Sequence, residues 1–473
     1  MYSQGLKTLV KRFDFSYVYA FLGEATLGLT FIFYMILGRT LGPEQYGIFT
    51  AATALGGIVA FFIQFGLHDL LAREIAANPQ EGPKSTSIFL LIESLNFLGV
   101  LIVLLPIAKL LNFEGIGLVI CYLVVIAGAC RCAKQTLRSV FRGLGHFRSE
   151  TISVTIERLA MFLLAGLILL VSNNLAWVVG TMALVRLIDI ICLFYYLNQH
   201  TLITSPITLK GFQRALKMAY PFALSGVLWV LYYQIDILML KVMAPSTETG
   251  FYGAAYSLIE IFSALPRVIF YVALPKFSRC YAEEPEQLPY QIQKTTYFLL
   301  IFVLPVITIA GLGQTFLVQL TYGQGFLSSI DSFSILLPSL GMKMFASLVL
   351  FLLQATRRER FLPPILLFAV IANILANAVL IPLLGAIGAA FATLLSEIIF
   401  AVAGLILIGR IGYRRVSQKL LIISVISLLV AVIPSLILNG LGLIIAMGIM
   451  ILSIAAITLI MRSSYFLPRV EKL

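Results

Sequence analysis

Residues 116–141 read IGLVICYLVVIAGACRCAKQTLRSVF. The first part of this stretch has no charged side chain, and a helix that crosses a membrane needs about 20 mainly apolar residues. Arg131, Lys134 and Arg138 follow at spacings of three and four residues, which return to the same side of a helix. The stretch is therefore predicted to be a membrane-spanning helix that carries its basic residues on one face.

Apolar stretches of this length recur along the whole chain of 473 residues. The sequence is 60% hydrophobic and 11% charged, with a mean hydropathy of +1.01, whereas soluble domains are about 25% charged. The composition predicts an all-α polytopic membrane protein. Fourteen spans are expected, at residues 15–38, 46–68, 85–107, 116–141, 149–171, 175–198, 213–243, 249–275, 294–313, 330–355, 361–381, 385–409, 418–438 and 441–462.

The basic residues predict how these spans are oriented. With the N-terminus in the cytoplasm, 24 of the 33 lysines and arginines fall in cytoplasmic loops and termini, and three fall outside: Arg39, Lys109 and Lys241. Membrane proteins show this bias because basic loops stay on the cytoplasmic side. Both termini are therefore expected in the cytoplasm. The net charge of +12 then faces anionic lipid of the inner leaflet, and it does not call for nucleic acid as a partner.

One sequence motif occurs twice. Residues 44–55 read EQYGIFTAATAL and residues 247–258 read TETGFYGAAYSL, so a glycine, an aromatic residue, two alanines and a leucine coincide at an offset of 203 residues. Six predicted spans separate the copies, so both halves enter the membrane from the same side, as parallel repeats do. Three parts are expected: an N-lobe at 1–200, a C-lobe at 201–410 that repeats it, and two further helices at 411–473.

Several short motifs resemble one known family. Residues 37–49, LGRTLGPEQYGIF, are similar to the signature turn of the polysaccharide-transporter branch of the MOP superfamily. Phe65-Gly-Leu, Phe141-Arg-Gly-Leu-Gly145 and Leu353-Gln-Ala-Thr356 are similar to that family as well. The resemblance implies a Wzx-type O-antigen flippase of the bacterial inner membrane, working beside other polysaccharide-assembly proteins of lipopolysaccharide synthesis. Its cargo would be an oligosaccharide linked to undecaprenyl diphosphate.

Basic residues within the spans are candidates for binding an anionic cargo, because a charge in the bilayer costs about 2.5–3.5 kcal/mol on insertion scales. Four basic residues of one predicted helix fall within an arc of about 80°: Arg131, Lys134 and Arg138 in the span 116–141, and Arg142 directly after it. Arginine can bind a diphosphate with two parallel hydrogen bonds. The candidate substrate-binding residues are Arg131, Lys134, Arg138, Arg142, Arg267 and Lys343. For Arg138 and Arg142, an equal alternative is that they extend to the inner interface.

Two carboxylates are candidates for coupling transport to an ion gradient. Glu24 lies near the middle of the first span and Glu260 lies in the eighth. Binding of a proton or Na⁺ changes the cost of burying a carboxylate, although a hydrogen bond between helices would also account for Glu24. Arg186 and Asp189 are three residues apart and are expected to neutralise each other. Asn373 and Asn377 are expected to bond neighbouring helices together.

Other functions remain open at this point. A small-molecule or drug antiporter of the MATE type is one alternative. A glycan polymerase or ligase is another, but the longest predicted outer loop, 314–329, has no acidic or basic residue for catalysis. The sequence has no Gly-Lys pair for a P-loop and no His-Glu-x-x-His motif. A transporter without enzymatic activity, cofactor or metal is therefore expected.

Overall fold

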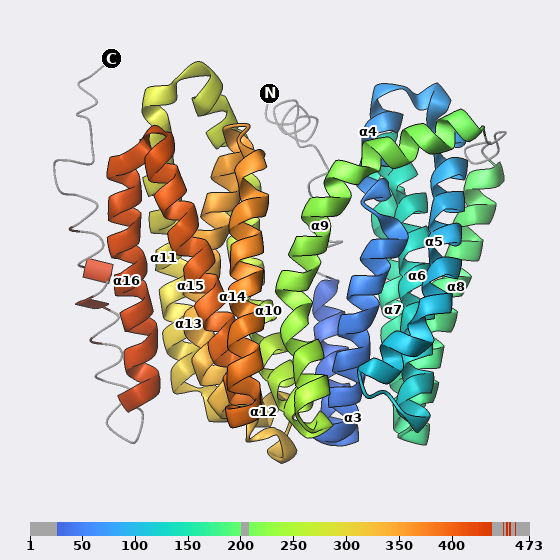
Figure 1. Ribbon diagram of the computed structural model, residues 1–473, viewed down its shortest axis with the longest axis horizontal. Coiled ribbons are helices and arrows are strands. Elements are labelled where there is room, and N and C mark those ends of the chain that lie inside the picture. The colour runs from blue at the N-terminus through green and yellow to red at the C-terminus, as the bar shows by residue number, and fades with distance from the viewer. Residues whose placement is uncertain are drawn as a thin grey trace, which may run out of the picture. The chain divides into compact units, whose positions relative to one another are not determined.

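The computed structural model describes residues 26–199 and 208–437, together with a few positions between 448 and 459. Over these residues the regular structure is entirely helical (Figure 1). Ten helical stretches of the described chain are long and apolar enough to cross a membrane. The predicted class, an all-α polytopic membrane protein, is confirmed.

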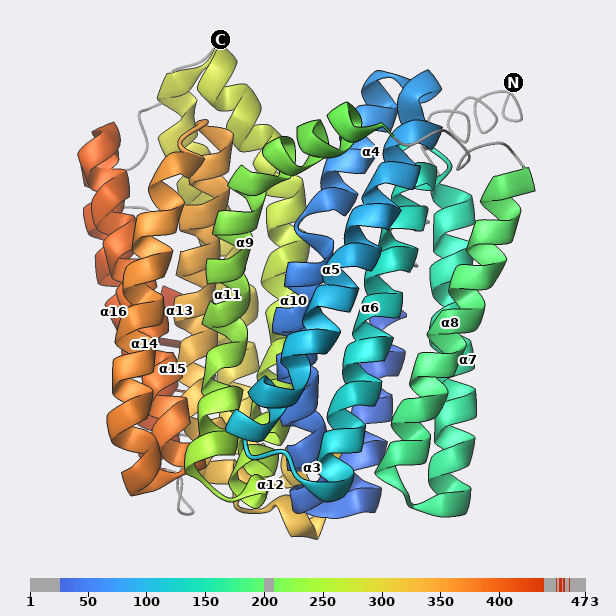
Figure 2. The same cartoon turned by 45° about the vertical axis from the view of Figure 1, so that its right-hand side comes forward.

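The chain forms two compact units, one of residues 1–41 and 48–230 and the other of residues 42–47 and 231–473. Within their described parts, the first unit contains most of α3 (Leu27–Gln64), α4 (Leu67–Ala77), α5 (Gly82–Leu110), α6 (Gly115–Gly143), α7 (Phe147–Ser172), α8 (Leu175–Gln199) and the start of α9 (Leu209–Met243). In both views α9 bends sharply after its first turns (Figure 2).

The second unit continues from the end of α9. It contains α10 (Ser246–Glu283), α11 (Leu288–Leu312), α12 (Gln314–Thr321), α13 (Ser329–Ala355), α14 (Leu362–Leu384), α15 (Ala386–Ile408) and α16 (Arg414–Ile437), with short 3₁₀ or π turns between several of them. Each expected span from 46–68 to 418–438 overlaps one of these helices over its described residues. The first expected span begins outside the described residues, and the last, 441–462, has only scattered described positions.

Helix α3 joins two expected spans across a break. Gly42 has φ 78° and ψ 174°, which is not helical, and glycine reaches positive φ without the strain that a Cβ causes. Pro43 follows and has no backbone N–H to donate to the preceding turn. The break separates the spans that the apolar pattern predicts, and Gly42–Gly47 is the segment of α3 that belongs to the second unit.

The two copies of the repeated motif touch within the second unit. A Cβ on Gly47 would lie 1.8 Å from the backbone oxygen of Ser246, and a Cβ on Gly250 would lie 2.0 Å from the backbone oxygen of Pro43. At the offset of 203 residues, Gly250 corresponds to Gly47 and Ser246 corresponds to Pro43. The contact is therefore reciprocal, and it requires the one residue type that has no side chain.

Candidate functional site

The basic residues of α6 lie on one face of the helix, but two of them form buried ion pairs with carboxylates of neighbouring helices. Lys134 and Arg138 are each 5% exposed. Lys134 is ion-paired with Glu157 of α7. Arg138 lies 3.1 Å from the second oxygen of Glu157 and 2.7 Å from Asp189 of α8, and it also donates a hydrogen bond of 3.0 Å to the hydroxyl of Ser153.

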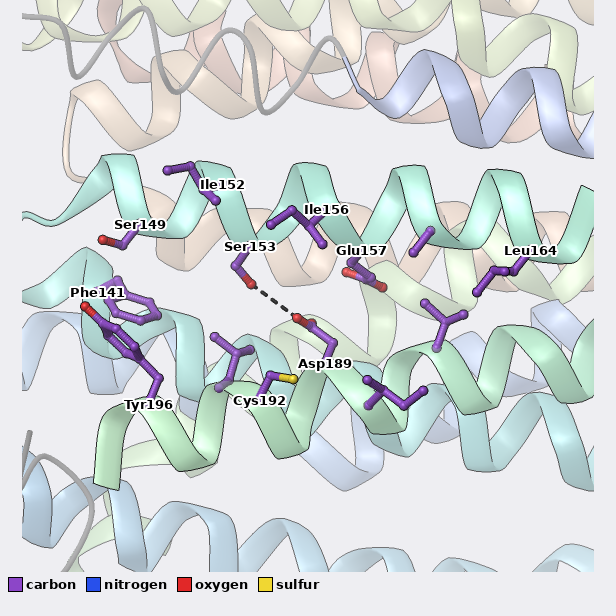
Figure 3. A pocket seen from close by; sticks show the side chains of 14 residues that line it. Phe141, Ser149, Ile152, Ser153, Ile156, Glu157, Leu164, Asp189, Cys192 and Tyr196 are labelled. Carbon is purple, nitrogen blue, oxygen red and sulfur yellow. Dashed lines mark hydrogen bonds between the residues drawn. The ribbon is translucent and has the colours of Figure 1, made fainter. Parts of the chain in front are cut away.

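Glu157 is the centre of this buried network. Besides Lys134 and Arg138, the Nε of Arg186 lies 3.7 Å from its carboxylate, and Arg186 donates a hydrogen bond of 3.0 Å to the backbone oxygen of Ala127. A buried carboxylate needs such partners because taking a charge out of water costs several kcal/mol. The hydroxyl of Ser153 points toward Asp189 between α7 and α8 (Figure 3).

The expected pair of Arg186 with Asp189 is wrong. Their spacing does place both on the same side of α8, but Asp189 binds Arg138, whereas Arg186 turns to Glu157. Cations from the neighbouring helix compete for the carboxylate, and a spacing argument along one helix does not include them. Arg142, at the end of α6, is partly exposed and is paired with Glu150 at 2.9 Å.

Arg131 differs from the other basic residues of α6. It is partly exposed, and no hydrogen bond or ion pair joins it to another described residue. One turn further along α6, Lys134 and Arg138 join Arg186 in a cluster of three cations around two carboxylates, Glu157 and Asp189. One positive charge of this cluster exceeds the negative charges that pair with it among the described residues.

Lys343 of α13 is a predicted substrate-binding residue outside the basic face of α6, and the structure describes its side chain. Its Nζ lies 3.5 Å from the hydroxyl of Tyr256 and 4.0 Å from the carboxylate of Glu397. It also lies 4.9 Å from the ring centroid of Tyr233 and 5.1 Å from that of Tyr256, which is within the range of a cation–π interaction. Lys343 is thus held by aromatic rings and a carboxylate from three other helices.

Of the remaining predicted site residues, the structure describes the side chain of Glu260. Glu260 lies on α10, one turn beyond Tyr256, and is partly exposed. The side chain of Arg267 lies outside the described residues, although its backbone belongs to α10. Glu24 also lies outside them.

Sequence reasoning assigned no role to Asp236, which the structure places in a polar cradle. Its side chain on α9 is 2% exposed. Tyr252 and Thr393 lie 3.0 and 2.7 Å from one carboxylate oxygen, and the amide of Asn377 donates a bond of 2.6 Å to the other. All three are uncharged, and the side-chain oxygen of Asn377 is buried with no hydrogen-bond partner in the described part of the chain.

The two asparagines do bond helices together, as predicted. Asn377 of α14 reaches Asp236 on α9, and Asn373 lies 3.4 Å from the hydroxyl of Ser396 on α15. The amide of Asn377 also donates to Asn373 at 2.9 Å. Two features of the sequence could have indicated this cradle: two asparagines four residues apart, and an aspartate within the expected span 213–243.

The sequence of the chain decides its family. Residues 16–281 match the pattern of the family described as polysaccharide biosynthesis protein. The chain belongs to this polysaccharide biosynthesis protein family. The chain is 24% identical to a Shigella flexneri protein named as an O-antigen transporter. The match extends over 318 residues, which are 63% of this chain and 73% of that protein.

Solved structures show that this family member has the MOP fold. The lipid II flippase MurJ in an inward closed conformation has a TM-score of 0.71 at 14% identity, over 94% of this chain and 98% of that one. An inward-facing multidrug resistance MATE transporter has a TM-score of 0.68 at 15% identity, over 82% and 95%. A MOP superfamily transporter from Pyrococcus furiosus has a TM-score of 0.60 at 16% identity, over 85% and 94%.

Proposed function

We propose that this protein is a flippase for oligosaccharides linked to undecaprenyl diphosphate. It moves them across the bacterial inner membrane by alternating access, with no chemical change to the cargo. The observation that carries this proposal is membership of the polysaccharide biosynthesis protein family together with similarity to a protein named for O-antigen transport. The fold shared with a lipid II flippase supports the same class of cargo.

The charges of the first unit support an anionic headgroup. Arg131 is partly exposed and lies one helical turn before Lys134, whose cluster with Arg138 and Arg186 has one positive charge more than its two carboxylates. A guanidinium can donate two parallel hydrogen bonds to phosphate oxygens. We therefore assign the first contact with the diphosphate to Arg131. Lys134 and Arg138, which are buried in ion pairs, hold α6 in position, and Arg267 and Lys343 remain proposed secondary contacts.

The energy source in this proposal is an ion gradient. Asp236 is a buried carboxylate that accepts hydrogen bonds from three neutral side chains, and the side-chain oxygen of its partner Asn377 has no hydrogen bond to another described residue. A proton or Na⁺ bound there would offset the cost of burying the charge, and carboxylate and amide oxygens suit a hard cation. Asp236 therefore joins Glu24 and Glu260 as a proposed coupling residue.

A second function, export of small molecules or drugs, is favoured by the MATE-like fold. Reconstitution separates the two functions. Purified protein in proteoliposomes should move a fluorescent undecaprenyl-diphosphate oligosaccharide to the opposite leaflet faster than protein-free vesicles do, when a proton or Na⁺ gradient is imposed. Vesicles that accumulate a cationic dye but leave the lipid-linked sugar in place would reject the flippase in favour of the antiporter.

A further inference from the structure

A groove runs between α7 and α8 in the first unit (Figure 3). It has a volume of about 510 Å³ and is lined mostly by apolar side chains. Ile156 and Leu164 on α7 are 60% and 47% exposed, and Ile188 on α8 is 50% exposed. Both helices are long and apolar enough to span the membrane, where lipid hydrocarbon and not water would surround these exposed side chains.

The groove is long enough for a lipid chain. Its lining on α7 extends from Ser149 to Leu164, which corresponds to about 22 Å of helix at 1.5 Å per residue. One leaflet contributes about 15 Å to a hydrocarbon core of about 30 Å. The polar groups on its floor do not oppose a chain, because Glu157 and Asp189 are already ion-paired with Lys134 and Arg138.

Basic residues mark one end of the groove. Phe141 and Ser149 line it there, next in sequence to Arg142 and Arg148. Arg148 is exposed, and Arg142 is partly exposed. Glu150 is the carboxylate paired with Arg142, whereas the exposed Arg148 forms no ion pair with another described residue. By the distribution of basic residues this end faces the cytoplasm, where anionic lipid attracts arginine.

We propose that this groove binds one phospholipid with an anionic headgroup from the inner leaflet. An acyl chain lies along Ile156, Leu164 and Ile188, and the phosphate lies at Arg148 and Arg142. The site is separate from the proposed contact of the cargo at Arg131. In this proposal one anionic phospholipid is a specific ligand of the transporter, in addition to the lipids that surround the protein.

Cys192 lines the groove and is exposed, so its thiol can report occupancy. Full-length protein in detergent, with Cys130 and Cys280 replaced by alanine, is labelled with a maleimide in the presence of phosphatidylglycerol or phosphatidylcholine. With phosphatidylglycerol at about four times its Kd, labelling should slow about fivefold, because only the empty fraction reacts. Phosphatidylcholine should slow it far less.

Two variants should remove this protection in different ways. Ala160→Trp fills the groove and should abolish slowing by any lipid, whereas Leu170→Trp, at a 79% exposed position of the same helix that does not line the groove, should leave it intact. Arg148→Gln should remove the preference for phosphatidylglycerol, and Arg410→Gln, an exposed arginine of the second unit, should not. The thermal unfolding temperature of each variant checks that it is folded.

Three results would overturn the proposal. Labelling that no lipid slows would mean that the groove is not a lipid site. Equal slowing by phosphatidylglycerol and phosphatidylcholine would mean that hydrocarbon fills it without headgroup recognition. Protection by undecaprenyl phosphate alone, with none from phosphatidylglycerol, would assign the groove to the chain of the cargo.

Discussion

At the scale of single residues, Arg131 and Lys134 stand one helical turn apart and are expected to respond differently to substitution. Arg131→Gln should reduce transport of the lipid-linked sugar at least about tenfold, the effect of losing about 1.4 kcal/mol of binding, with normal expression and unfolding temperature. Arg131→Lys should keep part of the activity because it keeps the charge. Transport assays in proteoliposomes measure this, with exposed Lys84 changed to Gln as the control for charge alone.

Lys134→Met should instead act on folding. It removes one of three cations around Glu157, which keeps Arg138 and Arg186, so stability should fall by less than the about 3–5 kcal/mol that an uncompensated buried charge costs. The double variant Lys134→Met with Glu157→Gln should recover part of that stability, because the carboxylate that lost its lysine becomes neutral while Arg138 keeps Asp189. Unfolding in detergent compares the three proteins. A double variant less stable than Lys134→Met would show that Glu157 is stabilised by Arg138 and Arg186 and not by Lys134.

The prediction for Asp236 concerns coupling. Asp236→Asn removes the negative charge from the cradle and keeps its size, so transport should become slower and independent of an imposed proton or Na⁺ gradient. Asp331→Asn, at an exposed position of the same unit, should keep gradient dependence. Flux measured with and without each gradient decides the matter, and an Asp236→Asn protein that is still gradient-driven would transfer the role to Glu24 or Glu260.

The sequence predicts the helix face of the basic residues but not the residues that pair with them. The face shared by the basic residues of α6 follows from spacing alone, and the structure keeps it. Their partners could not be predicted, because Glu157 and Asp189 come from α7 and α8 and several cations share them. The cradle of Asp236 is still less local, since Asn377 and Thr393 are 141 and 157 residues away in sequence.

At the scale of helices, the contact between α3 and α10 depends on Gly47. Gly47→Ala places a Cβ 1.8 Å from the backbone oxygen of Ser246, where no side chain can rotate away. The backbone must move, which should lower stability by about 2 kcal/mol or more. Gly99→Ala, within α5 and with nothing within 4 Å of its Cβ, should be neutral or stabilise by up to about 1 kcal/mol. Thermal unfolding of both variants tests the contrast.

Helices were the most predictable level of this structure. Each long apolar stretch that falls within the described residues is helical, because a backbone in lipid must satisfy its own hydrogen bonds. The break in α3 was also expressed in sequence, as Gly42-Pro43 between two apolar runs. The apolar pattern does not predict which helices contact one another, because lipid-facing and protein-facing sides are similarly hydrophobic.

At the scale of the whole molecule, the prediction is topological. Fourteen spans with both termini in the cytoplasm require that reporter enzymes fused after residue 200 and at the C-terminus have cytoplasmic activity. The bias of 24 basic residues against three is the reason for expecting this. A periplasmic signal at either fusion would change the number of spans and remove the argument for parallel halves.

The reciprocal glycine contact has a consequence for the origin of the chain. Two identical chains that pair about a two-fold axis make every contact twice, residue for residue. Pro43 with Gly250, and Gly47 with Ser246, form such a contact inside one polypeptide. A half-length ancestor whose copies met through this turn would already have possessed it as a homodimer. Duplication and fusion of its gene then needed only a connecting segment, and each half could afterwards acquire charges of its own.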